Sequence, residues 1–174
     1  MNEKRIEINA KIGYANAIRR ALISEIPMIC PEYIEIEKNT TSHTDEYIAH
    51  RIGLIPFHQN ENFESNSSFI NKRDTHLHGF DIHGDMKVEH PDVKVLDLTM
   101  GQELSCKIYF SKSTPAEHSR FARTVAVGMK TIDETNHIIK FESLLEDDED
   151  RCLSIAIDSI ESRLLKALEY CKNN

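Results

Sequence analysis

The side chains most able to do chemistry are concentrated in a histidine-rich stretch at residues 75–85. His76 and His78 would lie on the same face of a strand, because alternate residues of a strand point the same way. Asp81 or His83 could then complete a metal site, since imidazole and carboxylate groups are common zinc ligands. The same composition is also typical of an exposed polar loop. The stretch therefore leaves open a small metal-dependent enzyme that uses these histidines.

No complete reaction centre accompanies this stretch. Glu117 and His118 could act as an orienting carboxylate and a general base, but no nucleophile is specified near them. The sequence contains no G-x-S-x-G, P-loop or G-x-G-x-x-G motif. It has four cysteines, and none of them forms a C-x-x-C pair, so neither a zinc module nor a redox motif is indicated. We therefore expect no catalytic residue, no metal and no cofactor.

The charge balance disfavours direct binding of nucleic acid. Acidic residues number 29 against 21 basic ones, and the formal net charge is −8. Proteins that grip nucleic acid usually present a basic face, because contacts to phosphate supply most of the affinity. An independent nucleic-acid-binding regulator is thus disfavoured against a protein that works through protein partners. No signal peptide is recognisable and no apolar run approaches the ~20 residues of a membrane span, so we expect an intracellular location, in the cytoplasm or the nucleus.

The N-terminal part of the chain alternates predicted strands and helices. Residues 5–9 and 33–37 alternate apolar and polar side chains, as in strands with one face in water. Residues 14–26 carry apolar side chains at three- and four-residue steps, which predicts an amphipathic helix. A second helix is predicted at residues 45–52, with Thr44 as its N-cap.

Strand patterns return after a long polar segment. Residues 57–90 lose their periodicity, which indicates a loop or a weakly structured insertion. Residues 100–102 predict a hairpin turn between the next two strands, and residues 133–136 predict a turn between the two after those. The four predicted strands are residues 93–98, 104–110, 124–127 and 137–141.

The first and last helices carry more apolar surface than packing on one sheet requires. The last helix begins near the acidic run at residues 146–150, because negative charge stabilises the positive end of a helix dipole. Two such helices could bury one face on their own sheet and offer another to a partner, or the insert could cover that face within a single core. The order of elements is that of an α+β domain interrupted by an insert. The apolar stripe of the last helix consists of Leu153, Ile157, Ile160, Leu164 and Leu168.

Two long segments resemble a known family. Residues 16–27, N-A-I-R-R-A-L-I-S-E-I-P, resemble the N-A-L-R-R-A-L-L-S-E-V-P signature of RNA polymerase alpha-like subunits. Residues 45–56, D-E-Y-I-A-H-R-I-G-L-I-P, resemble the D-E-F-I-A-H-R-L-G-L-I-P stretch that follows it in the family. Residues 90–104, 112–121 and 141–143 are similar to later family segments in the same order. The family comprises the N-terminal domain of bacterial alpha, its archaeal counterpart and the third-largest subunit of eukaryotic polymerase II. The sequences of the two motifs are closer to those of the archaeal and eukaryotic members.

The resemblance implies a fold, a function and partners. The fold would be α+β, with a discontinuous dimerisation domain at residues 1–56 and 121–174, built from a mixed sheet with packed helices. A small, mostly β inserted domain would occupy residues 57–120. The function would be that of a non-catalytic assembly subunit of a multisubunit DNA-directed RNA polymerase, whose active site lies in the large subunits. The partners would be a smaller alpha-like subunit, or a second copy as in bacteria, together with the second-largest and largest subunits.

The resemblance also implies which residues make the contacts. The first and last helices would supply the dimer interface, formed by Ile18, Leu22, Leu153, Ile157, Ile160 and Leu164. Polar residues near the two motifs would face the second-largest subunit or order the local fold, namely Arg19, Arg20, Asp45, Glu46, His50 and Arg51.

Two departures from the family pattern are visible. Cellular members are longer, mostly through a larger insert whose cysteines often bind zinc or an iron–sulfur cluster, whereas residues 57–120 contain only Cys106. The K-W dipeptide of the family is replaced by Arg120-Phe121. A short insert without a cysteine cluster indicates a reduced polymerase, such as a viral one, for which the virion would be a further location.

Overall fold

The computed structural model describes residues 3–58, 67–146 and 148–173, and it divides into two compact units. Unit 1 is discontinuous and comprises Met1–Pro27 and Thr114–Asn174, and unit 2 comprises Met28–Ser113. Both units combine helices with antiparallel strands, so the predicted α+β class is confirmed. Among the described residues, no helix has both the length and the apolar character needed to cross a membrane.

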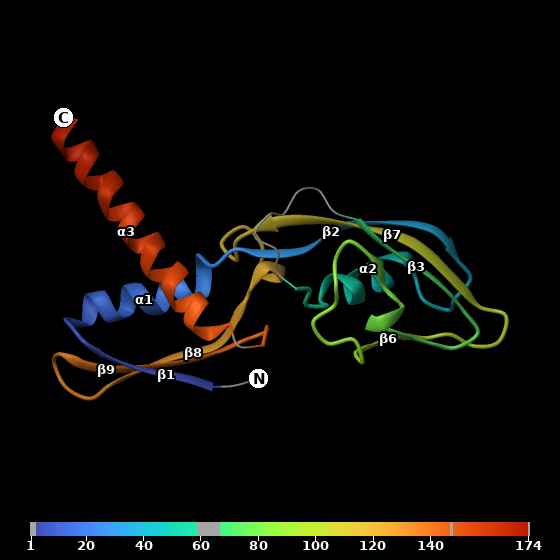
Figure 1. Ribbon diagram of the computed structural model, residues 1–174, viewed down its shortest axis with the longest axis horizontal. Helices are drawn as coiled ribbons and strands as arrows, with labels where there is room; N and C mark the ends of the chain where they lie inside the picture. The colour runs from blue at the N-terminus through green and yellow to red at the C-terminus, as the bar shows by residue number, and fades with distance from the viewer. Residues whose placement is uncertain (1–2, 59–66, 147, 174) are drawn as a thin grey trace. The chain divides into compact units, whose positions relative to one another are not determined.

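Unit 1 is a three-stranded antiparallel sheet covered on one face by two helices. The sheet has the strand order β1 (Glu3–Asn9), β9 (Asn136–Ser143) and β8 (Thr124–Thr131). Helices α1 (Ile12–Ser24) and α3 (Glu149–Asn173) contact each other and pack on this sheet (Figure 1). The alternation of β1 places Ile6 and Ile8 toward the helices. The buried residues of the unit 1 core are Ala21, Leu22, Ile26, Ile139, Phe141, Cys152 and Ala156.

The turn between β8 and β9 is held by the carboxylate of Asp133. It accepts hydrogen bonds from the backbone N–H of Thr135 at 2.9 Å, and from the backbone N–H and the side-chain amide of Asn136, both at 2.8 Å. The side-chain bond from Asn136, followed by the two backbone bonds, lowers the pKa of Asp133 to about 2. The predicted turn at residues 133–136 is therefore confirmed.

This lowered pKa predicts how the hairpin responds to acid. A carboxylate whose pKa is lower in the folded than in the unfolded state stabilises the fold above the unfolded pKa, which is about 3.9 for aspartate. The contribution of Asp133 is therefore expected to disappear as the pH falls from about 4 to about 2. A titration of the Asp133 carboxyl carbon by nuclear magnetic resonance should give a midpoint near pH 2. A midpoint near 4 would mean that the turn does not form as described.

Unit 2 is a four-stranded antiparallel sheet with a helix and a two-stranded ribbon on one face. The sheet order is β2 (Met28–Asn39), β7 (Glu103–Ser113), β3 (Ser67–Arg73) and β5 (His83–Gly84). The ribbon pairs β4 (His76–His78) with β6 (Lys94–Asp97), and the helix is α2 (Asp45–Gly53). Short 3-10 turns, η1 (Gly79–Asp81) in unit 2 and η2 (Ser119–Phe121) in unit 1, complete the elements.

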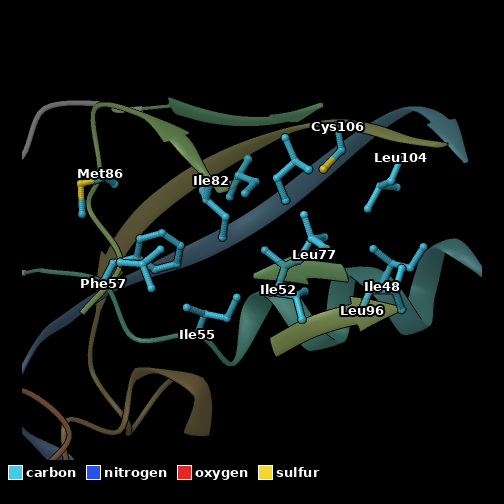
Figure 2. Close-up of a cluster of buried hydrophobic side chains, with 14 of the residues drawn as sticks. Ile48, Ile52, Ile55, Phe57, Leu77, Ile82, Met86, Leu96, Leu104 and Cys106 are labelled. Atoms are coloured by element: carbon cyan, nitrogen blue, oxygen red, sulfur yellow. The ribbon is translucent and has the colours of Figure 1, made fainter. Parts of the chain in front are cut away.

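The core of unit 2 lies between the sheet and α2. Thr44 caps α2 by accepting a hydrogen bond from the backbone N–H of Tyr47 at 3.4 Å, as predicted. Ile48 and Ile52, one turn apart on α2, point toward the ribbon and the sheet (Figure 2). Leu77 from β4 packs in the same cluster and is also fully buried. Unit 2 therefore has a hydrophobic core of its own.

The structure corrects several details of the predicted fold. The sheet of unit 1, predicted to be mixed, is antiparallel in every described pairing. Residues 100–102 do form a turn, with Gly101 at a φ of 85°, but the predicted hairpin is wrong because β6 pairs with β4 while β7 pairs with β2 and β3. Strand β3 lies in the segment predicted to be a loop.

The structure divides into units at other positions than the domain boundaries expected after residues 56 and 120. Strand β2 belongs to unit 2 because it pairs along its length with β7, and α2 belongs there because Ile48 and Ile52 complete that core. The division falls after Pro27 and after Ser113. The assignment of unit 1 as a dimerisation domain and of unit 2 as the inserted domain remains a proposal.

Candidate functional site

An apolar groove lies between α1 and α3 on the surface of unit 1. Its volume is about 410 Å³, and its lining is mainly apolar, with the Tyr14 hydroxyl and the Glu161 carboxylate as polar groups. Both helices contribute because each presents a second apolar side beyond the one that packs on the sheet. The lining residues are Tyr14, Ala17, Ile18, Ile157, Ile160, Glu161, Leu164 and Leu165.

The apolar surface continues along the second half of α3. Every described residue from position 161 onward is exposed, and Figure 1 shows α3 running on beyond α1. Leu164 is 55% exposed and Leu168 is 56% exposed. Leucines repeated at helical spacing in water are costly, and contiguous apolar surface of this kind marks sites of protein association. The α1–α3 face, meaning the groove lining together with Leu168, is therefore the candidate interface of unit 1.

The residues predicted for the dimer interface fall into two groups. Ile18, Ile157, Ile160 and Leu164 line the groove, although Ile18 and Ile160 also pack against the core. Leu22, by contrast, lies in the core with an exposed fraction of 0%, and Leu153 is half-buried against the same core. Leu22 on α1 and Leu153 on α3 lie on the sides of their helices that pack on the sheet, so both belong to the core below the α1–α3 face.

Four groove residues were not among those predicted for the interface: Glu161 and Leu165 on α3, and Tyr14 and Ala17 on α1. Tyr14 is exposed and Ala17 is half-buried, and both line the groove from α1. They precede Ile18 by four and one positions, so Tyr14 lies one helical turn from it on the same side. An aromatic residue one turn before the apolar row was the available signal for Tyr14.

A buried ion pair fixes the start of α3. The guanidinium of Arg123 donates to both carboxylate oxygens of Asp148, at 2.6 and 2.5 Å, and to the carbonyl oxygen of Pro27 at 3.3 Å. Asp148 also accepts from the hydroxyl of Ser143 at 3.2 Å and from the thiol of Cys152 at 3.0 Å. Both charged side chains are almost fully buried. The network attaches the helix that carries half of the candidate interface to the sheet beneath it.

A second polar contact ties α3 to the end of α1. Glu25 accepts a hydrogen bond from the Ser159 hydroxyl at 2.6 Å and forms an ion pair with Arg163 at 2.7 Å. The contact sits at the middle of α3, where the helix leaves the core. Together with the buried ion pair it sets the direction in which the exposed half of α3 extends.

The polar residues predicted for the large-subunit interface differ in what they do. In unit 1, Arg19 donates to the side-chain oxygen of Asn16 at 3.1 and 2.9 Å, while Arg20 is exposed. The Asn16–Arg19 contact is local to α1. Arg20 therefore has the more accessible guanidinium of the pair.

In unit 2 the predicted residues lie on and around α2. Arg51 donates to the backbone carbonyl oxygens of Val95 at 3.0 Å and Lys94 at 2.8 Å, so it orders the contact between α2 and β6. The carboxylate of Asp45 accepts from the Asn39 amide at 2.7 Å. The remaining two residues, Glu46 and His50, are exposed.

The histidine-rich stretch does not assemble a ligand set in the described residues. His76 contacts Asp97, the His78 ring stacks on Phe80 with 5.0 Å between centroids, and His83 lies against Phe69. Within residues 3–58, 67–146 and 148–173, no group of three or more His, Cys, Asp or Glu side chains is arranged to hold a metal ion.

The histidine of the Glu117–His118 pair has a structural role. The His118 ring nitrogen accepts a hydrogen bond from the backbone N–H of Arg120 at 3.2 Å, which caps η2. The imidazole is thus engaged in a local turn.

Comparison with known proteins finds short segments of high identity to RNA polymerase subunits. No family model matches the chain. A segment of 48 residues, 28% of this chain, is 50% identical to the DNA-directed RNA polymerase II subunit rpb3 of Dictyostelium discoideum, of which it covers 16%. A segment of 49 residues, also 28% of this chain, is 49% identical to 26% of the DNA-directed RNA polymerase subunit Rpo3 of Methanocaldococcus jannaschii.

A longer match has lower identity. It spans 124 residues, 63% of this chain, at 27% identity to 48% of the subunit Rpo3 of Pyrococcus horikoshii. In all three comparisons, the match covers less than half of the relative's length. The matches support a relationship of this chain to the alpha-like RNA polymerase subunits over the segments that they share.

Proposed function

We propose that this relative of the alpha-like RNA polymerase subunits is itself a non-catalytic assembly subunit of a multisubunit DNA-directed RNA polymerase. The single observation that carries the proposal is the α1–α3 face, an apolar surface left uncovered on the helices of unit 1. In this proposal unit 1 is the dimerisation domain and unit 2 is the inserted domain.

The size of the apolar surface supports a stable pair. Burial of one leucine or isoleucine side chain contributes about 1.5–3 kcal/mol. Association costs about 4–15 kcal/mol in lost freedom of motion, so several such side chains from both partners must become buried together. The exposed residues Ile157, Leu164, Leu165 and Leu168 of α3 meet this need on one side of the interface. The partner must bring a similar apolar helical face.

The partner in this proposal is a smaller alpha-like polymerase subunit. The named relatives are polymerase subunits of a eukaryote and of archaea. The motifs of this chain are closest in sequence to the archaeal and eukaryotic ones, and in those groups the alpha-like subunit pairs with a different chain. A second copy of this chain is the other candidate. The two differ in a simple observable, because a homodimer forms from the purified chain alone.

The large subunits would dock on polar residues outside the α1–α3 face. We assign this role to Arg20 in unit 1 and to Asp45, Glu46 and His50 around the start and end of α2, all of which are exposed. Arginine suits such a contact because its planar group can hold a carboxylate or carbonyl in two places. Arg19 and Arg51 would act indirectly, since both make contacts within their own unit.

Light scattering of the purified chain, alone and mixed with each alpha-like candidate, tests the proposal. We expect the mass of a one-to-one complex with one smaller alpha-like chain, and the mass of a monomer in its absence. The mass of a dimer in the absence of any partner would replace the heterodimer by the homodimer. A monomer under every condition would contradict the proposed function.

A further inference from the structure

We infer that the outer face of the unit 2 sheet binds an arginine-bearing segment of a partner protein. The outer face is the side of β2, β7 and β3 opposite the core, and its central residues are Tyr33, Glu35, Lys107, Tyr109 and Phe69. Alternation places these side chains together, because their sequence neighbours Ile34, Ile108 and Ile70 point into the core. Figure 1 shows α2 and β6 on the other side of these strands.

The outer face carries aromatic rings where a solvent-facing sheet usually carries polar groups. Tyr33 and Tyr109 are directly opposite on β2 and β7, and their rings stack with 4.4 Å between centroids. Phe69 is opposite Lys107 on the next strand, so it is the diagonal neighbour of Tyr109. Tyr33 is 56% exposed and Phe69 is 50% exposed. Aromatic rings held rigidly and half in water are typical anchors of protein interfaces.

The charges on the outer face indicate what the partner brings. Lys107 forms an ion pair with Glu37 at 2.8 Å, and Glu37 also accepts from the Ser105 hydroxyl at 3.2 Å. Glu35 accepts a hydrogen bond from the Tyr109 hydroxyl at 3.2 Å and is exposed. A carboxylate offers about four acceptor positions on two oxygens, so Glu35 can still receive the paired donors of a guanidinium. Around the two tyrosines, one cation therefore lies among two carboxylates, which leaves this part of the face with one negative charge in excess. Farther along the same face, Lys38 and Arg73 both pair with Glu103.

An arginine satisfies both features at once. Its planar group can stack on the side of the Tyr33 ring turned away from Tyr109 while its N–H groups donate to Glu35. A lysine lacks the planar group and would make only the charge contact. Single-stranded nucleic acid also stacks on aromatic residues, but its phosphates would meet Glu35 and Glu37 on a chain with a net charge of −8. The charge therefore favours a basic protein segment over nucleic acid.

Fluorescence polarisation with the full chain tests this inference. The probe is a fluorescein-labelled peptide of alternating arginine and glycine, compared with the same peptide carrying lysine and with labelled oligouridylate. We expect the arginine peptide to bind most tightly. Tyr33→Ala and Glu35→Gln should each weaken it by about two- to fivefold, the size of one exposed cation–π contact or one surface charge pair. The matched controls are Tyr170→Ala and Glu7→Gln, an exposed tyrosine and an exposed strand glutamate of unit 1.

Several results would overturn the inference. These are no binding of the arginine peptide, equal binding by the wild type and by Glu35→Gln, and tighter binding of oligouridylate than of the peptide. Backbone amide shifts during the titration give an independent readout, and they should be largest at Tyr33, Glu35 and Phe69. Shifts confined to unit 1 would equally contradict it. Because Glu35→Gln keeps the shape of the side chain, the test stands even if Tyr33→Ala disturbs the fold.

Discussion

Replacing Leu164 with aspartate is expected to abolish pairing through the α1–α3 face while the chain stays folded. Leu164 lines the groove and is 55% exposed in the single chain, so a polar side chain there costs little folding free energy. In a pair, the same position would be covered by the partner's apolar helix. The substitution would then remove about 1.5–3 kcal/mol of burial and add the larger cost of an unpaired buried charge. Together these predict a loss of affinity of at least about a thousandfold.

Light scattering of the wild-type and variant chains with the pairing partner measures this loss. The matched control is Ser162→Asp, which adds the same charge two positions away, about 200° around the helix and thus on the opposite side of α3. The control should pair like the wild type. Ile160→Asp is a less specific variant, since Ile160 also packs against the core of unit 1. Full pairing by a folded Leu164→Asp chain would remove this face from the proposed interface.

Replacing Arg123 with alanine is expected to destabilise unit 1 by about 3–5 kcal/mol. The substitution leaves the Asp148 carboxylate buried without its charged partner, although it keeps the hydrogen bonds from the Ser143 hydroxyl and the Cys152 thiol. Removing one member of a buried ion pair is costly because the remaining charge has lost both its water and its partner. Since this pair attaches the start of α3, hydrogen exchange of the first turn of α3 should accelerate as well.

Urea unfolding of the wild type, of Arg123→Ala and of the double variant Arg123→Met with Asp148→Leu measures the effect. The double variant removes both charges and fills the space with apolar groups, so it should recover most of the lost stability. Equal stability of the wild type and Arg123→Ala would show that the ion pair is not buried as described. A double variant as unstable as Arg123→Ala would show that lost packing, and not the unpaired charge, causes most of the loss of stability.

Periodicity alone was sufficient for the elements with one clear apolar side. The helix predicted at residues 45–52 is α2 (Asp45–Gly53), and the strands predicted at residues 104–110 and 137–141 lie within β7 and β9. Their patterns are strong because each element buries a full side against its own unit. The α+β class and the family relationship followed from the same residues. The two long motifs show helical periodicity and also match the family residue by residue.

Weakly patterned segments depended on tertiary pairing. Strand β3 (Ser67–Arg73) buries only Ser68 and Ile70, so its sequence resembles a polar loop, and its pairing with β7 makes it a strand. The partners of β6 and β7 could not be read from the turn between them, because a tight turn does not oblige its flanking segments to pair with each other. The boundaries of the two units follow from that same pairing.

For the candidate interface, the sequence determined that two helices have an excess of apolar side chains, and the tertiary structure decided which of them face outward. An apolar stripe on a helix shows that one side of the helix will be buried. It looks the same in the sequence whether that side is buried in the core or in an interface. Packing on the sheet of unit 1 takes Leu22 into the core and leaves Leu164 in water. The buried pair of Arg123 and Asp148 could not be foreseen either, because it joins residues 25 positions apart that only the fold brings together and removes from water.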